Sequence, residues 1–236
     1  AQAEAEERAA RARRQDYKPP EIDNEPEIAA NMARGGTTAA SVARAATQSR
    51  GIDMGRTTII GIIGAGQMGN GIAHVFALAG YDVLMTDISR EALDKAVALV
   101  DRNLSRQASR GKISDQDRDA ALGRIRTTLQ LSDLGQCDLI IEAATERETV
   151  KQAIFEDLVP HLKPHTILTS NTSSISITRL ASRTDRPEKF MGFHFMNPVP
   201  VMQLVELIRG IATDEPTYKA LHEVVERLGK TAASAE

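Results

Sequence analysis

The sequence predicts an α/β protein with a doubly wound, mostly parallel sheet. Five short apolar runs, rich in β-branched residues, alternate with segments whose apolar residues recur every three or four positions. A glycine-rich turn joins the first apolar run to the first of these amphipathic segments. Because strands that are apolar throughout must be buried on both faces, the pattern indicates a parallel sheet covered by helices on each side.

The order of the elements follows from these runs. We expect strands over 57–64, 81–87, 137–144, 165–171 and 189–195, and helices over 69–80, 89–111, 115–125, 148–162 and 175–182. His74 falls inside the first helix, where a packing or surface role is expected rather than a ligand role. All of these elements belong to one predicted domain, residues 54–236.

The chain before Met54 has a different composition. Residues 1–53 contain no Leu, Phe or Trp, and the first Leu of the chain is Leu78. The opening Ala/Glu/Arg-rich stretch favours a helix by propensity but has no apolar stripe to bury, and the next stretch is dominated by Pro, Asp, Asn and Gly. We therefore predict an N-terminal extension that is disordered or partly helical.

Overall composition excludes several classes of function. The net charge of -3 and the 3% aromatic content give no basis for nucleic-acid binding, and no apolar run approaches the roughly 20 residues of a membrane span. Cys137 is the single cysteine, so a disulfide framework is excluded. The chain also carries no apolar secretory signal, and Glu4, Glu6 and Glu7 argue against a mitochondrial transit peptide. We expect a cytoplasmic enzyme or ligand-binding domain.

The glycine-rich turn has the context of a dinucleotide-binding fingerprint. It follows a strand directly and opens a helix directly, which gives the G-x-G-x-x-G spacing its meaning and predicts a Rossmann-like fold. The first glycine permits a tight turn, the second lets a pyrophosphate approach, and the third lets helix and strand pack closely. The expected cofactor residues of this turn are Gly64, Gly66, Gln67, Met68 and Gly69. A glycine turn in a nucleotide-free, flavodoxin-like fold is the alternative.

Asp87 ends the second predicted strand. A carboxylate there accepts hydrogen bonds from an adenosine ribose and repels a 2′-phosphate, so NAD is expected rather than NADP. Arg90, three residues later, is the one nearby feature that softens this preference.

Polar residues follow the fourth and fifth strands, at the edge of a parallel sheet where ligands bind. "SNTSSISIT" places hydroxyls there, although Ser173 or Ser174 is equally suited to start the next helix. His194 lies in "GFHFMNPVPVMQLVELIRG" with no second His or Cys at ligand spacing, so no metal is expected. His194 is then a lone packing histidine or one paired with a carboxylate.

These motifs together resemble a known family. From Thr58 to about Lys230 the chain is similar to the L-3-hydroxyacyl-CoA dehydrogenases, in particular the bacterial 3-hydroxybutyryl-CoA dehydrogenases. The resemblance rests on GAGQMGNGIA, on DLIIEAATE with Lys151 five residues after Glu146, on SNTSSISIT, and on the segment around His194. The last two motifs are the specific ones.

The resemblance implies roles for individual residues. His194 would be the catalytic base, Glu206 the carboxylate that orients it, and Ser173 a contact to the substrate. The nicotinamide half of NAD would meet Glu146, Lys151, Ser173 and Asn197. An acyl-CoA thioester would be the substrate, with Asn103 and Arg110 near its CoA part and Lys112 available to its phosphates. For Arg110 and Lys112 a solvated helix end is the alternative.

The family also has a helical C-terminal domain that supplies a dimer interface and one wall of the substrate cleft. This chain ends where that domain would begin, so we expect it to be absent here and the full-length protein to be a homodimer. Two alternatives stay open: a related β-hydroxyacid or sugar-acid dehydrogenase, which would use a lysine base, and a non-catalytic NAD-binding module.

Overall fold

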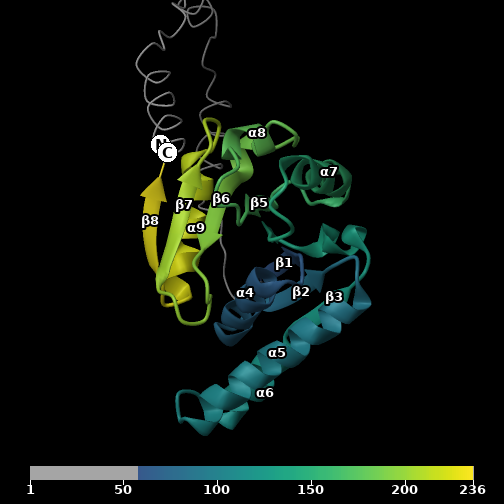
Figure 1. The fold of residues 1–236 in the computed structure, drawn as a ribbon. Helices are drawn as coiled ribbons and strands as arrows, with labels where there is room; N and C mark the ends of the chain where they lie inside the picture. The colour runs from purple at the N-terminus through teal and green to yellow at the C-terminus, as the bar shows by residue number, and fades with distance from the viewer. Residues whose placement is uncertain (1–57, 236) are drawn as a thin grey trace, which may run out of the picture. The chain divides into compact units, whose positions relative to one another are not determined.

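The structure is a computed structural model that describes residues 58–235 (Figure 1). The predicted N-terminal extension lies outside these residues, as does Met54. Within the described part, no helix is both long and apolar enough to cross a membrane.

A single eight-stranded sheet organises the fold and confirms the predicted class. The strands follow the order β3-β2-β1-β4-β5-β6-β7-β8 across the sheet, and the six from β3 to β6 run parallel to one another. Their bounds are β1 (Ile59–Ile63), β2 (Asp82–Thr86), β3 (Ile125–Thr128), β4 (Leu139–Glu142), β5 (Ile167–Ser170), β6 (Phe190–Phe195), β7 (Leu204–Arg209) and β8 (Thr231–Ala235).

Three of these strands were not predicted. Ile125 was placed at the end of a helix, which is wrong: α6 (Asp115–Gly123) stops earlier and Ile125 opens β3 beside β2. β7 returns antiparallel to β6, and β8 then pairs parallel to β7. Sequence signals are weak in β3, a four-residue strand with one apolar residue, and in β8, which is rich in alanine and largely exposed. Both lie at sheet edges, where little apolar surface is buried.

Helices cover both faces of the sheet, as expected (Figure 1). One buried cluster joins the sheet to α4, α5, α6 and α9, and a second joins its other face to α7, α8 and the 3-10 helix η1. The longer helices are α4 (Gln67–Leu78), α5 (Arg90–Ser109), α7 (Glu148–Leu158) and α9 (Glu215–Arg227), with α8 (Ile177–Ala181) and the 3-10 segments η1 (Leu131–Gln136), η2 (Val159–His161) and η3 (Pro187–Lys189) between them.

Local sequence explains where the helices begin. Ser89 accepts a hydrogen bond from the Ala92 N–H at the start of α5, and Ser114 forms a reciprocal capping box with Asp117 at the start of α6. His74, on α4, is 1% exposed and lies 3.2 Å from the Gln107 amide nitrogen of α5, so it is a packing residue between these two helices.

β1 lies at the point where the chain order reverses. The chain continues from β1 to β2 on one side, and β4 pairs with β1 on the other side. In an open α/β sheet a crevice forms at such a switch point, outside the carboxyl ends of the strands. The glycine turn after β1 therefore stands in the middle of the predicted cofactor site.

Candidate active site

The turn between β1 and α4 has the conformation that the glycine spacing predicts. Gly64 adopts φ +102°, and a Cβ added to it would lie 2.6 Å from the Ala143 carbonyl oxygen. A Cβ on Gly69 would lie 1.8 Å from the Gly64 carbonyl oxygen, so only glycine lets α4 pack this closely on the turn. Gly66 differs, because a Cβ there would meet no atom within 4 Å. Its open side faces the space that a pyrophosphate needs.

The start of α4 also fits a diphosphate. No side chain caps this helix at Gly66, and its first turn holds no acidic residue. Backbone N–H groups that no side chain satisfies, together with the helix dipole, attract an anion. The donor chemistry at this turn therefore suits the pyrophosphate of a dinucleotide.

Asp87 closes the turn from the end of β2. Its Oδ2 accepts a hydrogen bond from the Ala65 N–H at 2.8 Å, and its Oδ1 accepts one from the Ser89 N–H at 3.0 Å. These bonds orient the carboxylate at the edge of the groove. Arg90, the residue expected to soften the preference for NAD, donates a hydrogen bond to the Thr127 hydroxyl on β3 at 3.1 Å.

A groove of about 730 Å³ runs past the turn and Asp87. Gln67 and Met68, two of the predicted cofactor residues, line it. Its other walls are largely apolar, and Ile88, beside Asp87, is fully exposed at 101% of its reference area. An apolar side chain left this exposed next to the carboxylate expected to bind a ribose suits the face of an adenine ring. The further apolar wall residues include Leu129, Leu131, Val150 and Ile154.

His194 and Glu206 form a cross-strand pair. They are direct partners in the antiparallel β6–β7 register, and the His194 Nδ1 lies 2.8 Å from the Glu206 Oε2. The histidine side chain is 19% exposed and that of the glutamate 40%. The imidazole is thus partly buried, is oriented through Nδ1, and keeps Nε2 for another partner. Of the two roles that the sequence allowed, the histidine has the second, paired with a carboxylate.

Asn197 follows β6 and reaches the glycine turn. Its Oδ1 accepts a hydrogen bond from the Gln67 Nε2 at 3.2 Å. This contact joins two predicted cofactor residues that lie 130 positions apart. It brings the end of β6, which carries His194, to the start of α4.

The segment after β5 is held by Glu146. The Glu146 Oε1 accepts hydrogen bonds from the Thr172 hydroxyl, from the Ser173 N–H at 3.1 Å and from the Ser174 hydroxyl at 3.1 Å. Asn171 makes a further tie, since its Oδ1 accepts the Phe195 N–H at 2.8 Å. The segment that carries Ser173 is therefore bonded both to Glu146 and, through Asn171, to the strand that carries His194.

Lys151 lies beneath this segment and is 1% exposed. Its Nζ contacts both carboxylate oxygens of the fully buried Glu142, at 2.8 and 2.9 Å, and the Glu146 Oε2 at 3.4 Å. The Lys151 ammonium is thus bound by two carboxylates. Of these, only Glu146 is exposed at the surface of the site.

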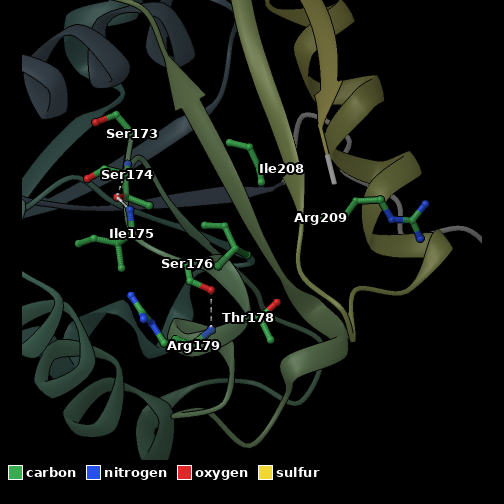
Figure 2. Close-up of a pocket in the computed structure, with 10 residues that line it drawn as sticks. Ser173, Ser174, Ile175, Ser176, Thr178, Arg179, Ile208 and Arg209 are labelled. Atoms are coloured by element: carbon green, nitrogen blue, oxygen red, sulfur yellow. Dashed lines mark hydrogen bonds between the residues drawn. The ribbon is translucent and has the colours of Figure 1, made fainter. Parts of the chain in front are cut away.

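Ser173 and Ser174 do not start the next helix. α8 is capped by Ser176, whose hydroxyl accepts the Arg179 N–H at 3.4 Å (Figure 2). The capping interpretation of Ser173 and Ser174 is therefore wrong, because their polar groups bond to Glu146 and Thr172 instead. Ser173, Ser174 and Ser176 line a cavity of about 380 Å³ together with Ile208 and Arg209, and Figure 2 shows the Arg209 side chain extending away from the serines.

A second groove, of about 500 Å³, lies between α5 and the segment after β6. Asn103 and Arg110, the two predicted CoA contacts, both line it, together with Lys112. Arg106, one turn before Arg110, adds a third cationic side chain. The remaining walls are Gln107, Pro198, Pro200, Val201 and Gln203.

Several of these residues escaped sequence reasoning. In the sequence, Glu142 is part of an apolar strand and Ile88 resembles an ordinary loop residue. Arg106 could have been predicted from the sequence. It lies four residues before Arg110, and residues four apart on a helix share a face.

In residues 58–235, no three His, Cys, Asp or Glu side chains gather in a way that would hold a metal ion.

Comparison with known proteins identifies the family. Residues 59–236 match the model of the NAD-binding domain of 3-hydroxyacyl-CoA dehydrogenase. The chain belongs to this family. Its cofactor is accordingly NAD, in agreement with the glycine turn and Asp87.

Individual relatives agree with this assignment. The chain is 56% identical over 177 residues to a 3-hydroxybutyryl-CoA dehydrogenase of Bradyrhizobium diazoefficiens, covering 75% of this chain and 60% of that relative. It is 47% identical over 174 residues to a probable 3-hydroxybutyryl-CoA dehydrogenase of Deinococcus radiodurans, covering 74% of this chain and 62% of the relative. The chain thus spans less than two thirds of the length of these curated relatives.

Solved structures share the fold. The (S)-3-hydroxybutyryl-CoA dehydrogenase of Ralstonia eutropha superposes with a TM-score of 0.74 at 44% identity, covering 75% of this chain and 63% of that chain. A prephenate dehydrogenase from A. aeolicus, at 19% identity and a TM-score of 0.57, covers 78% of this chain and 62% of its own and shares the fold alone.

Proposed function

We propose that this chain is the NAD-binding part of an L-3-hydroxyacyl-CoA dehydrogenase that interconverts 3-hydroxybutyryl-CoA and acetoacetyl-CoA. The observation that carries the proposal is the His194–Glu206 pair, in which the two side chains meet at 2.8 Å on the strand whose following residue Asn197 contacts Gln67 of the glycine turn. The family assignment and the names of the relatives support the substrate class.

His194 is proposed as the general base. Oxidation of a secondary alcohol removes the proton from the hydroxyl oxygen while a hydride leaves the carbon that bears this hydroxyl. Bound NAD supplies the hydride acceptor. His194 Nε2 would take the proton, and such general-base catalysis contributes about 100- to 10,000-fold in rate. Glu206 holds the proton on Nδ1 of the neutral ring and stabilises the imidazolium when it forms.

Ser173 and Asn197 are proposed to position the reactants. Ser173 is oriented by its own N–H bond to Glu146, so its hydroxyl is available to the substrate oxygen. Asn197 is proposed to contact the cofactor from the end of β6, where its amide oxygen already accepts a bond from Gln67. Lys151 is proposed to act through Glu146 because its ammonium is buried among carboxylates.

The groove beside α5 is proposed to hold the CoA part of the substrate. CoA carries several phosphate charges, and Arg106, Arg110 and Lys112 place three cations along one groove. Guanidinium groups bind phosphate oxygens in pairs, so they suit this partner. Asn103 adds an amide that can bond to the polar parts of the molecule.

The organisation of the whole protein is also proposed. Residues 1–53 are an extension and residues 54–236 the NAD-binding domain, and the full-length enzyme is a cytoplasmic homodimer. Support comes from the composition change at Met54, from the family resemblance, and from relatives that are longer than the matched part of this chain.

The test uses a chimera that contains the residues of this chain. In the chimera, the segment of the Bradyrhizobium relative that matches this chain is replaced by the matching residues of this chain. Acetoacetyl-CoA is added with NADH, and the loss of NADH absorbance is followed. We expect the chimera to oxidise NADH only when the thioester is present. A chimera that binds NADH and leaves acetoacetyl-CoA unchanged, or that reduces free 3-oxo acids such as acetoacetate in preference to the thioester, would refute the proposal.

A further inference from the structure

A buried charge cluster lies at the end of β4, formed by Glu142, Lys151 and Glu146. Glu142 and Lys151 are 0% and 1% exposed, whereas the Glu146 side chain is 40% exposed. The Lys151 ammonium bridges the two carboxylates, at 2.8 Å from Glu142 and 3.4 Å from Glu146. Since Glu146 also holds the Ser173 segment, the cluster extends from the core to the surface of the site.

Both carboxylates of the cluster accept several hydrogen bonds and contact the Lys151 ammonium. The Glu142 carboxylate accepts from three donors: the Ala144 N–H, the Lys151 ammonium and the Ser170 hydroxyl. A carboxyl proton would displace one of these bonds. Burial acts to raise the pKa of Glu146, but the hydrogen bond from Thr172 and the charge of Lys151 lower that pKa overall. Two carboxylates thus share one ammonium, and the cluster keeps one negative charge.

The position of the cluster follows from the sheet order. Asp87 and Ile88 border the groove on the β2 side of the glycine turn, which is the adenosine end. β4 and β5 lie on the opposite side of β1, and the second half of a dinucleotide extends to that side. Glu146 therefore stands at the nicotinamide end, beside Ser173.

We infer that the Glu142–Lys151–Glu146 cluster raises the affinity of the site for NAD⁺ relative to its affinity for NADH. The inference rests on the proposed function, which places the nicotinamide beside Ser173. The oxidised ring carries a positive charge and the reduced ring carries none, so a fixed negative charge attracts only the oxidised form. Glu206 carries a further negative charge beside His194, and it is retained in every variant of the test.

The primary test is Glu146→Gln in the complete 236-residue chain. Glutamine retains an oxygen that can accept the bonds from Thr172 and Ser173, while the charge is removed. Dissociation constants are measured by calorimetry for NAD⁺ and by fluorescence for NADH. We expect the NAD⁺ dissociation constant to rise about tenfold and that of NADH to change by less than about twofold, since a single charge acts over several ångströms in a partly shielded site.

A matched control removes a carboxylate two positions away. Glu148 pairs with Arg179 at 2.9 Å, so its charge is offset by a neighbouring guanidinium. Glu148→Gln should leave the ratio of the two dissociation constants unchanged. A second variant, Glu142→Gln, removes the same unit of charge from the cluster but leaves the bonds of Glu146 to the loop in place. It should reduce the NAD⁺ preference as Glu146→Gln does, and it carries the test if Glu146→Gln fails to fold.

The outcomes separate charge from position. Equal weakening of NAD⁺ and NADH binding in Glu146→Gln would show that Glu146 only positions the loop, and the inference would be wrong. An unchanged ratio in Glu142→Gln would equally overturn it. If the wild-type chain bound neither form, the proposed function would fail together with the inference.

Discussion

His194 and Glu206 lie 12 residues apart in the sequence and opposite each other across the β6–β7 pair. Side chains of directly opposed residues on one face of an antiparallel pair come within a few ångströms of each other. The separation of 12 residues is thus the length of chain that turns and returns antiparallel from His194 on β6 to Glu206 on β7. Sequence reasoning could name both residues from the family resemblance, but their register needs β7, which was not predicted as a strand.

Asp87 gives the first prediction at the scale of a residue. Asp87→Asn retains one acceptor oxygen for the Ala65 N–H and removes the negative charge that a 2′-phosphate would meet. We expect NADH to bind about tenfold more weakly, because a charge-assisted hydrogen bond becomes neutral, and NADPH to bind more tightly. Fluorescence titration with each cofactor measures both changes. A parallel weakening of NADH and NADPH would show that Asp87 serves the turn alone.

The glycine turn, taken as an element, combines two kinds of constraint. Gly64 and Gly69 are glycines because a Cβ would strike backbone atoms in and beside the turn. Gly66 is free of such contacts. The spacing in the sequence predicted all three glycines and a separate role for each, and the Cβ contacts fit this division: Gly64 and Gly69 are needed by the fold, whereas Gly66 is free for the proposed contact with the cofactor.

A matched pair of substitutions tests this separation. Gly66→Ala should leave the thermal midpoint of unfolding nearly unchanged, since its Cβ meets nothing within 4 Å. NADH affinity should fall at least about tenfold, because the methyl group occupies the path of the pyrophosphate. Gly69→Ala should lower the unfolding midpoint as well. Comparable destabilisation by both substitutions would contradict this separation of roles.

The contact between α4 and α5 predicts a pH dependence of stability. Burial lowers the pKa of His74 to about 4, from 6.5, and its bond to Gln107 only partly offsets this. The unfolded chain therefore binds a proton at higher pH than the folded chain does. The contribution of His74 to the free energy of unfolding is fully present above pH 6.5 and is lost as the pH falls towards 4. By pH ~5 the loss is about 2 kcal/mol.

Urea unfolding at several pH values measures this loss. His74→Leu should remove this part of the slope, while His161→Gln, at an exposed histidine, should leave it intact. A slope that is unchanged in His74→Leu would show that other groups cause it.

At the scale of the whole molecule, the sequence predicts the class of the sheet but not its full extent. Strands β1, β2, β4, β5 and β6 are apolar and bounded by turn residues, so periodicity located them within a few residues. β3 and β8 lie at the two edges of the sheet, where pairing with a neighbour rather than burial creates the strand. Such strands depend on contacts that are distant in sequence, and no local pattern predicts them.

The site was predictable to a similar degree. Residues whose motifs carry a mechanism, such as Gly66 and Asp87, followed from spacing and context. Glu142 did not, because a carboxylate inside an apolar strand becomes meaningful only when Lys151 is seen to reach it. The groove proposed to hold CoA needed α5 and the segment after β6 to come together, which the sequence leaves open.

We propose that His194 acts as a base on a scaffold that binds NAD independently of it. The most direct test measures His194→Gln in the chimera that carries this chain's residues, by turnover of acetoacetyl-CoA and by NADH binding. We predict that turnover falls by at least about 100-fold while the NADH dissociation constant changes by less than about twofold. Equal losses in turnover and NADH affinity would contradict the claim and make His194 a structural residue.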